Sequence, residues 1–151
     1  MGLSRDFQDM LHLLHERNVR YLVIGGLAFI FHAKPRYTKD MDLWIDPEPE
    51  NVEQANRALR EFGSPDCLDA LKKSEILQIG TEPNRIDLLL EVEGMEFGSA
   101  WPKRVEENYG DAPANFIDLD SLIAIKSRID HPRHRDDVMV LKEVKRLREA
   151  Q

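Results

Sequence analysis

Apolar residues recur along the chain at two spacings, and these spacings predict where the helices and strands lie. The N-terminal segment has the i, i+3, i+4, i+7 spacing of an amphipathic helix, and Ser4 precedes it as a cap. Its apolar positions are Phe7, Met10, Leu11 and Leu14. Further helices are expected over residues 27–33, 50–63, 120–129 and 136–150, the last two on either side of a basic loop.

Short runs of β-branched and other apolar residues predict the strands. Residues 20–24 and 41–45 are expected as buried strands, and residues 114–119 as a further short one. Residues 75–80 and 85–91 flank the turn sequence TEPN, which is typical of a β-hairpin. Because strands and helices mix without strict β-α-β alternation, we predict an α+β fold with a mixed β-sheet flanked by helices.

Length and composition narrow the class of protein. The 151 residues suit one domain, expected to span residues 1–151. No apolar run approaches the ~20 residues that cross a bilayer, and the N-terminus lacks the pattern of a signal peptide, so no membrane partner is expected. The single cysteine, Cys67, excludes an intrachain disulfide. The lack of a signal-peptide pattern and the single cysteine fit a reducing cytoplasm, which is the expected location.

The net charge of −7 limits non-specific attraction to nucleic acid, which depends on neutralising phosphates. Any polyanion that binds must therefore meet a locally basic surface. Two segments are basic, residues 32–39 and residues 126–135.

Asp40 and Asp42 are the first candidates for chemistry, because side chains two positions apart share one face of a strand, with Cα atoms about 6.6 Å apart. A half-solvated edge strand would give the same alternation. The strand continues as the apolar sequence LWI, however, which favours a central position. Two carboxylates on a buried face repel each other and lose hydration, and a hard divalent cation offsets both costs.

Asp87 is a lone acid within the apolar run RIDLLL, and by itself a structural role is an equally good interpretation. If its strand lies beside that of Asp40 and Asp42, three carboxylates converge. That is the layout of two-metal phosphoryl-transfer sites. We therefore predict Mg²⁺ at these three residues, as two ions, with Mn²⁺ as an alternative.

Gly25 and Gly26 end one expected strand and open the following helix. Backbone N–H groups at such a point are unpaired, and the absence of side chains lets a phosphate approach closely. Arg36 and Thr38 lie in the return loop before Asp40, where they can contact phosphate or orient that carboxylate. A GG pair alone also fits a simple tight turn.

Lys126 lies near the C-terminal end of an expected helix, where the helix dipole favours a cation. It could also neutralise a triphosphate, and both interpretations stay open.

The stretch GGLAFIFHAKPRYTKDMDLWID resembles the signature of the nucleotidyltransferase superfamily, in which a strand ending in GG or GS is followed by D-x-D on the next strand. It is most similar to minimal enzymes related to the AbiEii-type toxin nucleotidyltransferases. The matching positions are Gly25, Gly26, Ala28, His32, Arg36, Thr38, Asp40, Asp42 and Leu43. The resemblance extends to Asp87 as third carboxylate, and to a C-terminal segment through Lys126, Arg133 and Asp137.

The resemblance implies a polymerase-β-like fold and transfer of an NMP from an NTP to an acceptor hydroxyl on RNA, tRNA or protein. It implies that Asp40, Asp42 and Asp87 are catalytic and hold the metal, and that Gly25 and Gly26 contact the triphosphate. It also makes Lys126 a nucleotide contact. A toxin role and an antitoxin-like protein partner are further expectations.

Two alternatives stay open. The first is a non-catalytic nucleotide-binding or interaction module on the same fold, against which the presence of all three carboxylates argues. The second is a metal-dependent nuclease. Its sites often include E-x-K, which RIDLLLE lacks, and it has no need of the glycine turn.

Overall fold

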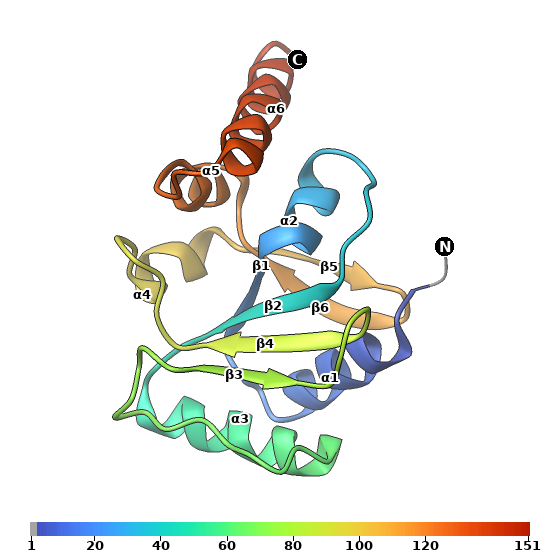
Figure 1. Ribbon diagram of the computed structural model, residues 1–151, viewed down its shortest axis with the longest axis vertical. Helices are drawn as coiled ribbons and strands as arrows, with labels where there is room; N and C mark the ends of the chain where they lie inside the picture. Colours follow the sequence, from blue (N-terminus) through green and yellow to red (C-terminus); the bar gives the residue numbers. More distant parts are fainter. Residues whose placement is uncertain (1–2) are drawn as a thin grey trace.

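Two central strands, β1 (Tyr21–Ile24) and β2 (Asp40–Ile45), position the glycine pair and the first two aspartates. They belong to a six-stranded sheet with the order β3-β4-β2-β1-β6-β5 in the computed structural model, which describes residues 3–151 (Figure 1). The other strands are β3 (Ile76–Ile79), β4 (Arg85–Leu89), β5 (Val105–Tyr109) and β6 (Ala112–Phe116). All four residues of β1 are buried, as expected for a strand inside the sheet.

The sheet is mixed. β2 runs antiparallel to β1 and parallel to β4, while β1 runs parallel to β6. The β3-β4 and β5-β6 pairs are antiparallel hairpins. The α+β class with one mixed sheet is therefore confirmed, and so are the central position of β2 and the hairpin around residues 80–84.

Helices cover both faces of the sheet (Figure 1). They are α1 (Arg5–Glu16), α2 (Gly25–His32), α3 (Pro49–Phe62), α4 (Phe97–Ala100), α5 (Leu119–Ser127) and α6 (Pro132–Glu149), with a 3₁₀ turn at Trp101–Lys103. α1 and α3 pack on one face, and α2 lies with α5 and α6 over the other. None of the helices within residues 3–151 has the length and apolar character needed to cross a membrane.

The alternation of side chains along β2 separates the core from the site. Met41, Leu43 and Ile45 are fully buried in the core that α1 and α3 complete. Asp40, Asp42 and Trp44 point to the opposite face, where Trp44 joins a second apolar cluster with Phe97. The period-2 pattern therefore fixes the aspartates on the α2 side of the sheet.

Several parts of the chain differ from the sequence-based expectation, and α4 with the 3₁₀ turn after it was not expected. β5 was not expected, because its polar sequence VEENY forms an exposed sheet edge without an apolar alternation. β6 spans residues 112–116, whereas a strand was expected over 114–119. α6 begins at Pro132 rather than at residue 136, since the His131 side chain caps it by accepting a hydrogen bond from the Arg133 N–H. Much of the expected basic loop is therefore the first turn of a helix.

Candidate active site

Three carboxylates meet on the α2 side of the sheet. Asp40 and Asp42 share a face of β2, and Asp87 lies on β4 directly opposite Asp42 in the strand register. One oxygen from each side chain lies within 4.8 Å of the others. Asp87 is only 7% exposed, and the other two are partly buried. The structure thus brings together the three aspartates that the sequence singled out.

Arg85 supplies positive charge to this cluster. It precedes Asp87 by two positions on β4, so both side chains leave the same face. Its Nη2 donates to Asp40 Oδ2 at 2.8 Å, and its Nε donates to Asp87 Oδ1 at 3.0 Å. The guanidinium therefore bridges the outer two carboxylates and offsets part of their repulsion. Sequence reasoning missed Arg85, although R-x-D on one strand was a usable signal.

Asp42 receives no such contact and is the most perturbed of the three. Burial, followed by the charges of Asp40 and Asp87, raises the pKa of Asp42 to about 7. Burial and the Asp87 charge also raise the pKa of Asp40, although Arg85 opposes the shift. The site therefore holds more negative charge than its own residues stabilise, which favours a bound cation.

The donor set fits a divalent metal ion. Carboxylate oxygens are the ligands that Mg²⁺ prefers, and three of them from two neighbouring strands lie within reach of one centre. Burial and neighbouring negative charge raise the pKa of Asp42, and a cation bound at this point would favour its ionised form. Asp40, Asp42 and Asp87 are the residues that would hold the ion.

The glycine pair makes room for this cluster. Gly25 has φ +67°, a left-handed conformation that favours glycine, and a Cβ there would lie 2.1 Å from Asp42 Oδ2. A Cβ on Gly26 would lie 2.8 Å from Thr38 Oγ1. Both residues begin α2, and its N-cap residue, Ile24, offers the N–H groups of the first turn no side-chain acceptor. The arrangement suits an anion beside the carboxylates.

A hollow of about 330 Å³ lies next to these glycines. We call it the glycine cavity. Its lining contains the glycine pair, the two β2 aspartates and several cationic or hydroxyl-bearing residues: Gly25, Gly26, Arg36, Tyr37, Thr38, Lys39, Asp40, Asp42, Lys126, Arg133 and His134. The structure therefore gathers around one hollow seven of the eight residues that the sequence selected, and Asp87 lies beside them on β4.

Arg36 and Lys126 reach the glycine cavity through a buried ionic network. Arg36 donates to both oxygens of Asp137, at 2.6 and 3.0 Å, and the Lys126 Nζ donates to Asp137 Oδ2 at 2.9 Å. The Arg36 guanidinium also lies 4.0 Å from the centre of the Phe29 ring. One carboxylate thus fixes two cations from distant parts of the chain.

Burial alone would raise the pKa of Asp137, but the hydrogen bonds from Arg36 and Lys126 outweigh it and hold the pKa below its ordinary value. Burial lowers the pKa of Lys126 despite its bond to Asp137. With one anion facing two cations, the network keeps a net positive charge at the cavity wall.

Thr38 contacts the main chain of Asp40. Its Oγ1 donates to the backbone oxygen of Asp40 at 3.2 Å, which ties the return loop to the start of β2. Arg133 was named only as part of the C-terminal resemblance, and His134 was expected in a basic loop without a role. As part of the first turn of α6, they line the glycine cavity.

Comparison with known proteins supports the fold. No family model matches the chain, and no curated protein sequence matches it. The lincosamide antibiotic adenylyltransferase LnuA, solved with lincomycin bound, aligns with a TM-score of 0.64 and 16% identity over 95% of this chain and 99% of that one. ANT(2")-Ia in complex with adenylyl-2"-tobramycin gives a TM-score of 0.58 and 15% identity over 95% and 93%.

An antigenic nucleotidyltransferase-like protein from Paracoccidioides brasiliensis gives a TM-score of 0.54 and 16% identity, covering 97% of this chain and 79% of that one. Two of these neighbours are an adenylyltransferase and a nucleotidyltransferase-like protein by name, and the third was solved with an adenylylated compound. At these identities the comparison shows a shared architecture. The chain therefore has the nucleotidyltransferase fold that its sequence resemblance implied.

The raised pKa of Asp42 predicts how stability changes with pH in the metal-free protein. The folded state holds a proton on Asp42 that the unfolded state releases, so stability falls as pH rises from about 4 to about 7. Asp42→Asn removes this loss and should be more stable than wild type at pH 8, by up to ~4 kcal/mol. Thermal melts in EDTA across this range test it. A mutant that is less stable than wild type at every pH would contradict the expectation.

The positive φ of Gly25 predicts a large effect of a single methyl group. Gly25→Ala should lower stability by at least ~1–2 kcal/mol, because alanine is strained at this φ and its Cβ meets Asp42. It should also abolish the thermal stabilisation by Mg²⁺ with NTP. Gly98→Ala is the matched control, since nothing lies within 4 Å of a Cβ there. Equal melting curves for the two variants would contradict the expectation.

Proposed function

We propose that this protein is a Mg²⁺-dependent nucleotidyltransferase that moves an NMP from an NTP to an acceptor hydroxyl. The observation on which the proposal rests is the cluster of Asp40, Asp42 and Asp87 beside the N-terminus of α2. The nucleotidyltransferase fold of the three structural neighbours supports the same activity.

The glycine cavity is the proposed NTP site. Phosphate oxygens accept hydrogen bonds from the backbone N–H groups of Gly25 and Gly26, where no side chain blocks their approach. Lys126 and Arg36 supply positive charge from the wall, and Thr38 holds the loop. Lys39 and Arg133 add cationic side chains to the lining. The cavity is thus suited to a polyphosphate.

The proposed reaction is an in-line displacement. The acceptor oxygen forms a bond to the α-phosphorus, the bond between that phosphorus and the α–β bridging oxygen breaks, and pyrophosphate leaves with the electron pair. Asp87 takes the hydroxyl proton, because it is the one carboxylate of the three that does not line the glycine cavity. When bound, Mg²⁺ supplies charge neutralisation and orients the phosphates. The remaining rate enhancement comes from the protein, which holds the two reactants in position.

Two acceptor classes have support. The resemblance to AbiEii-type enzymes favours RNA, tRNA or protein, together with a toxin role and an antitoxin-like partner. The structural neighbours favour a small molecule, since one was solved with lincomycin and another with adenylylated tobramycin. A non-catalytic nucleotide-binding module is the remaining alternative.

The activity is tested with each of the four NTPs labelled at the α-phosphate, in Mg²⁺ or Mn²⁺. We expect pyrophosphate release together with transfer of the label to an acceptor, and a loss of at least ~100-fold in Asp40→Asn and Asp87→Asn. Glu107→Gln, on the exposed β5 edge, is the matched charge control. Shortened nucleic acid would indicate a nuclease instead, and nucleotide binding without release would indicate the non-catalytic module.

The toxin role has a separate test. Expression of wild type should arrest growth, and Asp42→Asn, which alters a proposed metal ligand, should not. Labelled NTP added to total RNA, tRNA and cell protein then identifies the acceptor. Normal growth at matched expression levels would remove the toxin role while leaving nucleotidyl transfer intact.

A further inference from the structure

The Arg85 guanidinium lies between two of the three carboxylates that would hold the metal ion. Its Nη2 donates to Asp40 Oδ2 at 2.8 Å and to Asp87 Oδ2 at 3.2 Å, and its Nε donates to Asp87 Oδ1 at 3.0 Å. Both oxygens of Asp87 therefore accept hydrogen bonds from one planar cation. Such two-pronged contacts are the strong and geometrically specific form of an ion pair.

The proposed reaction needs the same carboxylates for another cation. A divalent ion binds carboxylate oxygens at about 2.0–2.1 Å in the case of Mg²⁺, and an ion shared by Asp40 and Asp87 must lie between them. The Nη2 of Arg85 is already at such a bridging position. Since two cations cannot lie between the same pair of oxygens, an ion that bridges Asp40 and Asp87 requires Arg85 to move.

Arg85 has a second acidic partner toward solvent. Its Nη1 lies 3.4 Å from Glu82 Oε1, in the turn between β3 and β4. The Glu82 side chain is 48% exposed and that of Asp87 is 10% exposed, with Arg85 between them at 27%. Glu82 also lies 3.8 Å from the Lys39 Nζ, but an exposed pair of this kind is weak. An outward rotation would therefore leave Arg85 with a carboxylate partner.

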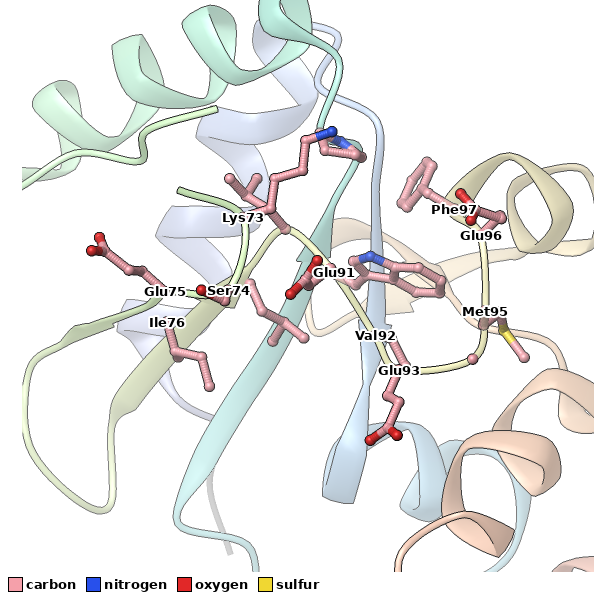
Figure 2. Close-up of a pocket in the computed structure, with 15 residues that line it drawn as sticks. Lys73, Ser74, Glu75, Ile76, Glu91, Val92, Glu93, Met95, Glu96 and Phe97 are labelled. Atoms are coloured by element: carbon pink, nitrogen blue, oxygen red, sulfur yellow. The ribbon is translucent and has the colours of Figure 1, made fainter. Parts of the chain in front are cut away.

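Other glutamates lie at the opposite end of β4. Figure 2 shows four of them around a cavity of about 950 Å³. This cavity is lined by Trp44, Pro47 and residues 73–76 and 89–97. The strand begins at Arg85 and reaches the cavity at Leu89, four positions or about 13 Å away. Among the described residues, Glu82 is thus the one acid outside the carboxylate cluster that Arg85 contacts.

Resting on the metal-dependent transfer proposed above, we propose that Arg85 competes with divalent ions for Asp40 and Asp87. In the nucleotide-free protein it pairs with both carboxylates and disfavours a bound ion. When an ion binds together with an NTP, Arg85 releases both carboxylates and pairs with Glu82. The phosphates favour this exchange, because they add ligands and negative charge beside the site. Arg85 thereby makes the binding of metal depend on the binding of nucleotide.

Binding of Mn²⁺ to the nucleotide-free protein tests the proposal, measured from the loss of the electron paramagnetic resonance signal of the free ion. At pH 8 Asp42 is mostly ionised, because its pKa is about 7. We expect Arg85→Gln to bind Mn²⁺ at least about tenfold more tightly than wild type. Arg57→Gln makes the same change of charge at an exposed position on α3 and should change the affinity less than about twofold. Unchanged or weaker binding in Arg85→Gln would overturn the proposal.

Arg85→Lys separates competition for the oxygens from the effect of charge alone. Lysine keeps the positive charge but lacks the planar fork that reaches both carboxylates. We expect an affinity between those of wild type and Arg85→Gln. Wild-type affinity in Arg85→Lys would show that charge alone governs binding and would overturn the proposal. This variant also carries the test if Arg85→Gln does not fold.

A double-mutant cycle tests the release onto Glu82. Glu82→Gln should weaken Mn²⁺ binding about threefold, because Arg85 then loses its outer partner and stays with the aspartates. In the Arg85→Gln background the same change should have an effect of less than about 1.5-fold. Equal losses in the two backgrounds would overturn this part of the proposal.

Transfer of label from the α-phosphate of each NTP is measured in parallel. If wild type and Arg85→Gln bind Mn²⁺ equally and wild type transfers label, the competition fails and the proposed function stands. If Arg85→Gln binds Mn²⁺ more tightly as stated but wild type transfers label from no NTP, Arg85 competes with the ion and the proposed transfer reaction fails.

Discussion

The close approach of three carboxylates on one face of the central strands is the constraint on which the rest of the site depends. Burial, followed by their mutual repulsion, raises the pKa of Asp42 to about 7. Arg85 bridges two of the three and offsets part of the cost. Gly25 is required next to them because a side chain at that position would collide with Asp42. The site is thus assembled at the expense of stability, which a bound cation can restore.

The buried network around Asp137 balances this concentration of negative charge. Asp137 on α6 holds Arg36 from the loop before β2 and Lys126 from α5. A buried ion pair adds little net stability, but loss of one partner leaves an uncompensated charge, so such a network fixes geometry more than it adds free energy. Its effect is to keep α6, α5 and the loop before β2 together at one wall of the glycine cavity.

The sequence by itself determined the local features of the site. Period-2 alternation placed Asp40 and Asp42 on one face of a strand, since neighbouring side chains on a strand must point to opposite sides. The GG pair marked a change from strand to helix, which the structure has at Gly25. Strong apolar runs predicted the central strands, whereas the polar edge strand β5 had no such signal.

Only the tertiary structure decided which distant residues meet. Asp87 faces Asp42 because β2 and β4 pair in parallel, and a register between strands so far apart in sequence has no local signal. Arg36 binds Asp137 across 101 positions, so the sequence could identify the cation but not its partner. The cavity beside Trp44 and Pro47 likewise forms only where segments 73–76 and 89–97 come together. Local sequence fixes the direction of each side chain, but long-range packing selects its neighbours.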